Sequence, residues 1–88
     1  MTKRAKLLQK LRAVSSGGAA FSDVVTLLEA YGFRRNRVSG SHWFFVYTDQ
    51  SGNHVKVGFA VVNGKLVKVP YVKRIVEKID SVRDENED

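Results

Sequence analysis

The sequence has no cysteine, a single proline and no long apolar run, and each of these features excludes a class of protein. One proline in a chain that is 43% hydrophobic excludes a disordered protein. Without cysteine, a disulfide scaffold and a zinc–thiolate site are both excluded. No stretch approaches the roughly 20 apolar residues that cross a membrane. The basic N-terminus is not followed by the apolar core of a signal peptide. We therefore expect a cytoplasmic protein with no membrane partner, stabilised by its hydrophobic core.

Acidic residues are scarce outside the C-terminal end. Residues 84–88 hold four of the nine acidic side chains, so residues 1–83 carry fifteen basic and five acidic side chains, a formal net charge of +10. This excess indicates a polyanionic partner, with nucleic acid first and an acidic protein second. We predict one domain over residues 1–83, because chains below about 100 residues rarely divide. A flexible acidic tail over residues 84–88 is expected to follow.

Two stretches have the apolar spacing of amphipathic helices. The first covers residues 3–14, with one apolar face and basic residues elsewhere. Gly17 is expected to take the left-handed conformation that ends such a helix. The second helix is predicted to begin at Ser22, whose hydroxyl would cap it, and to end at Gly32. Asp23 would then lie in the first turn, where the helix dipole favours negative charge.

Three stretches that alternate like half-buried strands follow the second helix. Two short, turn-forming connections join them, which predicts an antiparallel meander over residues 33–38, 42–48 and 54–60. In the first strand, alternation would place Phe33, Arg35 and Arg37 on one face. In the third strand, His54 and Lys56 would point outward. In the second strand, alternation places the aromatic residues Trp43, Phe45 and Tyr47 on one face and His42, Phe44 and Val46 on the other.

The C-terminal part of the sequence predicts a final helix. Residues 65–69 fit either a short fourth strand or an extended loop, and Pro70 suits the first turn of the helix. The order is thus an extra N-terminal helix followed by α-β-β-β-α. Helices with one apolar stripe and a sheet with one buried face predict a two-layer α+β sandwich whose other sheet face is open. The stripe of the final helix consists of Val72, Ile75, Val76, Ile79 and Val82.

Three motifs, in this order and spacing, resemble those of the HicA toxins. Phe33-Arg34 follows a helix that ends in Leu27–Gly32, and Gly40-Ser41-His42 precedes Trp43 and two apolar residues. Gly64-Lys65, Lys68 and Pro70–Arg74 then lead into the last helix. The resemblance covers about residues 21–79, roughly two thirds of the chain.

The resemblance implies a fold similar to that of double-stranded-RNA-binding domains. It also implies a toxin of a type II toxin–antitoxin pair, an endoribonuclease that cleaves messenger RNA and is inhibited by a HicB-like antitoxin. Only His42 matches the family's catalytic assignment. The chain departs from the family's pattern in two places: Trp43 stands where many relatives have a second histidine, and residues 59–63 lack a Pro-x-His element.

The residues around His42 suit RNA cleavage without a metal ion. In that reaction the 2′-hydroxyl attacks the adjacent phosphate while a base removes its proton and an acid protonates the leaving 5′-oxygen. An imidazole can do either near neutral pH, so we predict that His42 is the acid/base. The predicted phosphate ligands are the side chains of Arg34, Arg35, Arg37 and Lys56 with the backbone of Gly40 and Ser41.

Trp43 is a candidate for stacking on an unpaired base, as aromatic side chains do in proteins that bind single-stranded RNA. His54 is a candidate second acid/base if it reaches the open face of the sheet. No metal ion or cofactor is expected, because two histidines without cysteine, and without a carboxylate close to His42 in sequence, make no ligand set.

Two other functions remain open from the sequence. The chain fits a non-catalytic RNA-binding module whose basic face contacts phosphates, and such a module would keep salt-sensitive RNA binding when His42 is replaced. It also fits an interaction protein whose basic surface meets an acidic partner. That protein would bind one partner tightly and RNA weakly.

Overall fold

The computed structural model describes residues 2–83, which form an α+β fold of three helices and two antiparallel sheets. The predicted acidic tail lies outside the described residues. The helices are α1 (Lys3–Arg12), α2 (Phe21–Ala30) and α3 (Val69–Val82). The strands are β1 (Ala19–Ala20), β2 (Arg34–Ser39), β3 (His42–Thr48), β4 (His54–Ala60) and β5 (Leu66–Val67).

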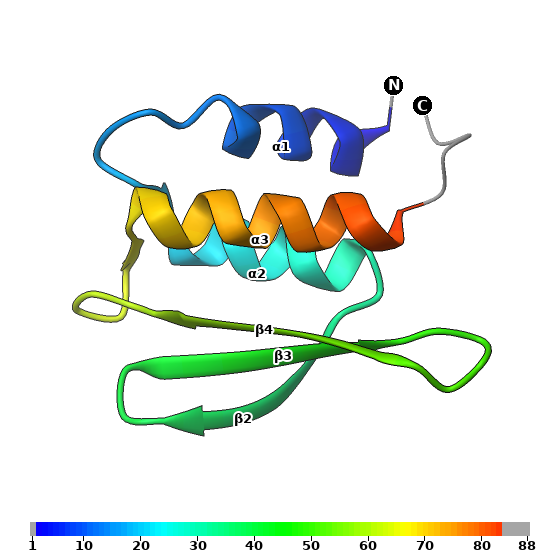
Figure 1. Ribbon diagram of the computed structural model, residues 1–88. Helices are drawn as coiled ribbons and strands as arrows, with labels where there is room; N and C mark the ends of the chain where they lie inside the picture. The colour runs from blue at the N-terminus through cyan, green and yellow to red at the C-terminus, as the bar shows by residue number, and fades with distance from the viewer. Residues whose placement is uncertain (1, 84–88) are drawn as a thin grey trace.

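The elements stack in layers, with the sheet on one side and the helices on the other (Figure 1). The larger sheet has the strand order β2-β3-β4, which is the predicted antiparallel meander. Helices α2 and α3 cover one of its faces, and none of the described elements covers the other. Helix α1 lies on α2 and α3, away from the sheet, and adds a third layer. The sheet therefore has one face in the core and one open face.

Polar contacts hold α1 against the other two helices. The Arg4 guanidinium donates a hydrogen bond to the carbonyl oxygen of Ala30 at 3.0 Å, at the C-terminal end of α2. Arg12 donates two hydrogen bonds to the carboxylate of Asp80 on α3, each 2.7 Å long. These bonds hold the pKa of the Asp80 carboxyl below its ordinary value. Helix α1 is therefore part of the folded body and does not extend as a separate arm.

The start of α2 differs from the prediction. The helix begins at Phe21, and Ala20 stands at the N-cap without a side-chain hydrogen bond, so the predicted cap at Ser22 is wrong. The N–H of Phe21 instead donates to the carbonyl oxygen of Lys65 at 2.8 Å. A neighbouring segment thus satisfies a group that a capping side chain would otherwise bond. Asp23 lies in the first turn, as predicted.

The segment at residues 66–67 is a strand, and its partner β1 was not predicted. Residues Ala19 and Ala20 pair with Val67 and Leu66 to make the small second sheet. Gly18 permits this close approach, because a Cβ atom there would lie 2.3 Å from the carbonyl oxygen of Val67. Gly17 has the predicted left-handed conformation, with φ +74°, but it does not end α1, because the helix already ends at Arg12.

A bulge in β2 changes which faces its arginines occupy. Arg35 pairs with Phe45 and Arg37 pairs with Phe44, so one extra residue lies between them. The Arg35 guanidinium lies 5.8 Å from the Trp43 ring centroid on the helix side, whereas the Arg37 guanidinium lies 5.0 Å from the Phe44 ring centroid on the open side. The predicted placement of Arg35 and Arg37 on one face is therefore wrong.

The core lies between the sheet and the helices. Phe45 and Phe59 stack with their ring centroids 5.8 Å apart, and no polar side chain is buried among the described residues. Helix α3 packs closely on β4, but α2 makes only sparse backbone contact with β2 and β3. Other fully buried side chains are Val24, Leu27, Leu28, Phe33, Val67, Val72, Ile75 and Ile79, which includes most of the predicted α3 stripe.

Candidate nucleic-acid interface

The strand register brings the predicted histidine and three predicted cations to the open face of the sheet. Directly paired residues of neighbouring strands project from the same face. From the pairs in the structure, this face carries Arg34 and Arg37 from β2, His42, Phe44 and Val46 from β3, and His54 and Lys56 from β4. Among the paired strand residues of this face none is acidic, because the remaining ones are Ser39, Thr48, Gly58 and Ala60.

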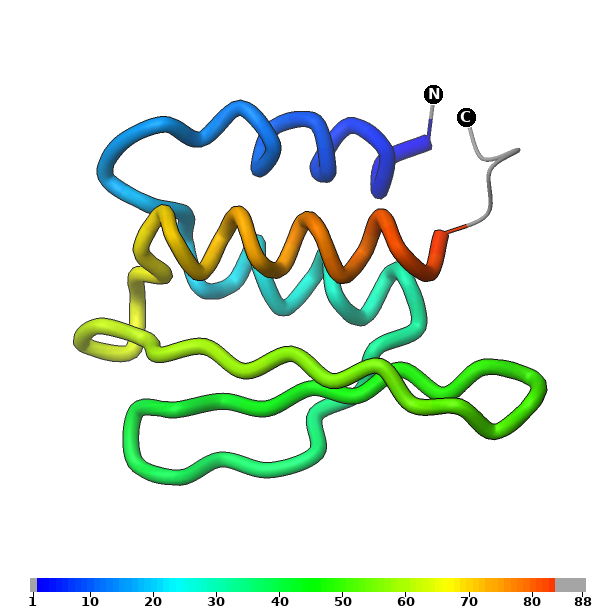
Figure 2. Tube along the Cα trace, in the orientation of Figure 1, coloured from blue at the N-terminus to red at the C-terminus, as the bar shows by residue number. Residues whose placement is uncertain are grey.

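A tight turn positions His42 at one end of this face. Gly40 and Ser41 form a two-residue turn, and Gly40 has the positive φ of +60° that such turns require. The N–H of Val61 donates to the carbonyl oxygen of Ser41 at 2.8 Å, which ties the turn to the end of β4. Figure 2 shows this turn at the same end of the molecule as the start of α3. His42 is exposed, and within residues 2–83 its imidazole has no hydrogen-bond or ion-pair partner.

The cations lie at different distances from His42 along the sheet. Arg37 pairs with Phe44, two positions along β3 from His42, or about 7 Å of strand. Arg34 and Lys56 both pair with Val46, four positions or about 13 Å away. Arg37 is therefore the predicted cation best placed to reach a phosphate at His42, while the other two can contact a neighbouring phosphate.

An aromatic platform adjoins His42, and the sequence-based prediction missed it. The ring of Phe44 lies over Gly58, where a Cβ atom would come within 2.9 Å of two ring carbons. The Arg37 guanidinium lies on the ring at 5.0 Å. Strand alternation already put Phe44 beside His42, but only the pairing with Gly58 shows that its ring lies against the backbone of β4. Phe44, and not Trp43, is therefore the aromatic ring on the face that carries His42.

His54 is on the open face, but far from His42. It pairs with Thr48, six positions along β3 from His42, which corresponds to about 20 Å. The His54 Nδ1 atom lies 2.9 Å from the Thr48 hydroxyl, in hydrogen-bond contact. His54 therefore cannot serve the same phosphodiester as His42, and the candidate role of second acid/base is wrong.

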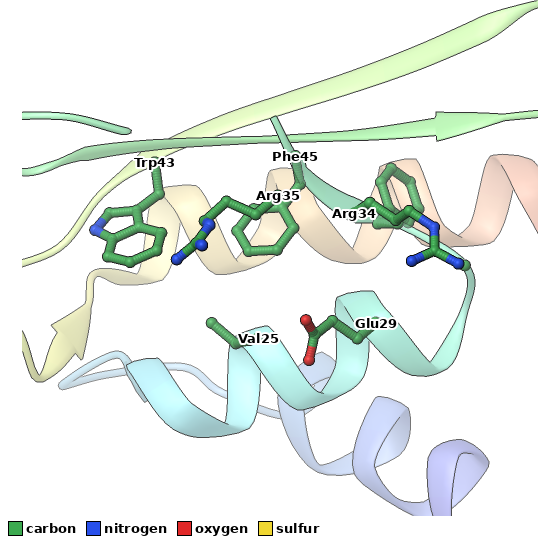
Figure 3. Close-up of a pocket in the computed structure, with 8 residues that line it drawn as sticks. Val25, Glu29, Arg34, Arg35, Trp43 and Phe45 are labelled. Carbon is green, nitrogen blue, oxygen red and sulfur yellow. The ribbon is translucent and has the colours of Figure 1, made fainter. Parts of the chain in front are cut away.

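Two predicted site residues lie on the other face of the sheet. Trp43 packs against Phe21 with a tilted ring at a ring-centroid distance of 4.8 Å, and the Arg35 guanidinium lies 5.8 Å from the Trp43 ring centroid. Both line a groove of about 640 Å³ between α2 and the strands (Figure 3). The structure does not bring Arg35 or Trp43 to His42. The groove also contains Glu29, which the sequence-based prediction did not single out.

No group of three or more potential metal ligands occurs within residues 2–83. In the same range, no helix has the length and apolar character of a membrane span.

Comparison with known proteins assigns neither a family nor a function to the chain. No family model matches the chain. Searches of curated proteins and of solved structures also find no match. The interpretation of the site therefore depends on its own geometry and chemistry.

Proposed function

We propose that this protein is a HicA-like toxin of a type II toxin–antitoxin pair, an endoribonuclease that cleaves messenger RNA in the cytoplasm without a metal ion. The observation that carries the proposal is the exposed imidazole of His42, which has no partner within residues 2–83. The paired strand residues of its sheet face include three cations and no carboxylate. Phosphodiester cleavage needs both a titratable group and positive charge at the phosphate.

The arrangement of elements supports the fold that the resemblance implies. The order α2-β2-β3-β4-α3, with an antiparallel sheet and both helices on one of its faces, is the order expected of a fold similar to double-stranded-RNA-binding domains. Helix α1 is an addition to that order. In this proposal α1 contributes stability, because its contacts are with α2 and α3 on the side away from the sheet.

The geometry suggests a role for each residue on the open face. Arg37 binds a non-bridging oxygen of the scissile phosphate, and its planar fork can do so bidentately. Phe44 stacks on the adjacent base. His42 accepts the proton of the 2′-hydroxyl as its oxygen attacks phosphorus, the bond to the 5′-oxygen breaks, and water protonates that oxygen. The product fragment then ends in a 2′,3′-cyclic phosphate.

An antitoxin fits the same face. Arg34, Arg37 and Lys56 give it uncompensated positive charge, so the expected partner is a HicB-like protein that presents carboxylates to these side chains. Such a protein would exclude RNA by covering His42. A complex with the partner that leaves His42 accessible would count against inhibition by blockage.

One observation favours a second candidate function, a non-catalytic RNA-binding module. The second histidine lies about 20 Å from the first, so no other imidazole of this chain can share the proton transfers. A binding module needs the cations and Phe44 but no proton transfer.

Incubation of the purified protein with total RNA in EDTA separates the two candidates. If the protein is a nuclease, fragments with cyclic-phosphate ends should accumulate with the wild type and with His54→Ala, but not with His42→Ala. If it is a binding module, the RNA should stay intact in all three samples, and the three proteins should bind RNA equally, with the same sensitivity to salt. Equal cleavage by the wild type and His42→Ala would reject the role of His42.

A further inference from the structure

The groove on the helix side of the sheet has a structural cause. Helix α3 packs on β4, whereas α2 stands off from β2 and β3, so a space remains along the edge strand β2. Its volume of about 640 Å³ lies within the range of about 300–1,000 Å³ that is usual for small-molecule sites. Figure 3 shows Trp43, Arg35 and Phe45 on the strand side of this space, opposite Val25 and Glu29 of α2.

The lining combines an aromatic surface with charges of both signs. Trp43 supplies the aromatic surface, and Arg35 from β2 lies opposite Glu29 from α2, while Arg34 borders the groove at the start of the edge strand β2. The three charged side chains are exposed, and no ion pair involves any of them within residues 2–83. Carboxylate and guanidinium groups in one groove without pairing can each serve a ligand. That ligand must offer hydrogen-bond donors to Glu29 and acceptors to an arginine.

We propose that this groove binds one unpaired guanine base of the RNA. The inference rests on the RNA substrate proposed above and names a second contact point on it. Guanine alone among the four bases presents two adjacent donors, N1–H and the N2 amino group, which the two oxygens of Glu29 can accept together. Its O6 and N7 acceptors suit the fork of Arg35, and its ring stacks on Trp43. A phosphate alone fits less well, because Glu29 repels it.

The position of the groove relative to His42 gives the RNA a short path. His42 and Trp43 are consecutive in β3 and project from opposite faces, and only the edge strand β2 separates the groove from the open face. The bulge in β2 places Arg35 on the groove side and Arg37 on the open side. The backbone of a single strand that leaves the groove can therefore follow these arginines around the edge to His42.

Trp43 provides the measurement, because it is the one tryptophan of the chain. Titration of the protein with GMP, AMP, CMP and UMP should quench its fluorescence as a base stacks on the indole. N-acetyltryptophanamide, titrated in parallel, corrects for absorption by the nucleotides. We expect saturable quenching by GMP at concentrations about tenfold lower than by AMP, CMP or UMP, the discrimination of one good bidentate contact. Equal affinity for the four nucleotides would overturn the proposal.

Two pairs of variants test the groove residues. Glu29→Gln should reduce the preference for GMP over AMP at least several-fold, whereas Glu77→Gln on α3 should leave it unchanged. Arg35→Gln should weaken GMP binding. Its control is Arg74→Gln, since Arg74 also lies over an aromatic ring, that of Tyr71 at 5.9 Å. Thermal unfolding of each variant confirms that the fold is kept. An unchanged GMP preference in a folded Glu29→Gln variant would overturn the assignment.

The His42→Ala variant tests binding in the groove independently of cleavage at His42. The proposal predicts wild-type GMP binding in this variant. If the wild type binds GMP selectively but cuts no RNA, the guanine site stands and the nuclease proposal fails. If it cuts RNA but shows no selective quenching, the guanine site fails and the nuclease proposal stands.

Discussion

The two faces of the β2-β3-β4 sheet are built by alternate residues of the same strands, yet they differ in almost every physical property. The helix-facing side of β3 carries Phe45, which is 1% exposed and stacks on Phe59 in the core. The open side carries His42, Phe44 and the cations, none of which is fully buried. One face holds the fold together, and the other has charge and an imidazole that the fold does not use.

This difference means that stability and activity are expected to separate by face. Most loss of stability comes from cavities in the core or from unpaired buried polar groups, and the open face has neither. Substitutions there should therefore change RNA cleavage or binding with little change in unfolding. Substitutions of the alternate residues should do the reverse.

The largest expected effect is on the open face. His42→Ala should lower the rate of RNA cleavage by about 10²–10⁴-fold, the usual contribution of a general acid or base. The free energy of unfolding should stay within about 0.5 kcal/mol of the wild type, because the side chain is exposed and without a partner in residues 2–83. Single-turnover cleavage and urea unfolding measure the two quantities. A large loss of stability in His42→Ala would contradict the expectation that stability and activity depend on different faces of the sheet.

Adjacent phenylalanines of β3 give the most direct test of the comparison. Phe45→Ala should destabilise the fold by about 3–5 kcal/mol, because it leaves a cavity beside Phe59. Phe44→Ala should cost about 1 kcal/mol, because its ring lies on the surface over Gly58. Phe44→Ala should also weaken binding of single-stranded RNA, by about 1–3 kcal/mol if a base stacks there. Equal destabilisation by the two substitutions would contradict the assignment of faces.

The cations should contribute a smaller, salt-dependent effect. Arg37→Gln should reduce the slope of log binding constant against log salt concentration by about 0.7, the value for one phosphate contact to a single strand. Lys6→Gln removes the same charge from α1, on the side of the helices away from the sheet, and should leave the slope nearly unchanged. Each substitution is combined with His42→Ala, so that RNA is bound but not cleaved, and binding is measured at several salt concentrations to give both slopes. An equal change in both would indicate that net charge, not the open face, binds RNA.

The smallest effect concerns the helical layers. The pKa of Asp80 is lowered by its hydrogen bonds with Arg12, so this pair stabilises the fold fully above the unfolded pKa of the carboxyl. The stabilisation is lost as the pH falls through the lower, folded value. Asp80→Asn should therefore destabilise the protein at pH 7 by up to about 1 kcal/mol. The difference from the wild type should begin to shrink below about pH 4 and vanish only as the pH falls through the lower, folded pKa.

Urea unfolding of both proteins across this pH range measures the effect. Glu77→Gln is the matched control, because this exposed carboxylate has no ion pair in the described part of the chain. RNA cleavage by Asp80→Asn should equal that of the wild type while the variant is folded, since the pair lies on the helical side of the molecule.

The elements with strong periodicity were predictable from the sequence. The spacing of apolar residues identified the three helices, and alternation in β3 and β4 correctly separated the core side chains from His42, Phe44 and Lys56. These patterns are local consequences of 3.6 and two residues per repeat, so they can be read from the chain alone. The toxin and nuclease assignments remain predictions.

The predictions that failed concerned features that depend on residues far away in the sequence. Ser22 looked like a cap, but Lys65 bonds the start of α2, and β1 exists only because β5 lies beside it. His54 faces the open side as its alternation required, but its separation from His42 follows from the register of β3 and β4. No local pattern contains that register.

The sequence by itself determined the composition of this protein's surface: excess positive charge, a histidine that begins an aromatic strand, and arginines just before it. Tertiary structure decided how these groups are divided between two sites. The bulge in β2 places Arg37 with His42 and Arg35 with Trp43, and the separation of α2 from the strands opens the groove that contains Glu29. The physical reason is that a side chain's face depends on the pairing of its strand, and pairing involves residues far apart in the chain.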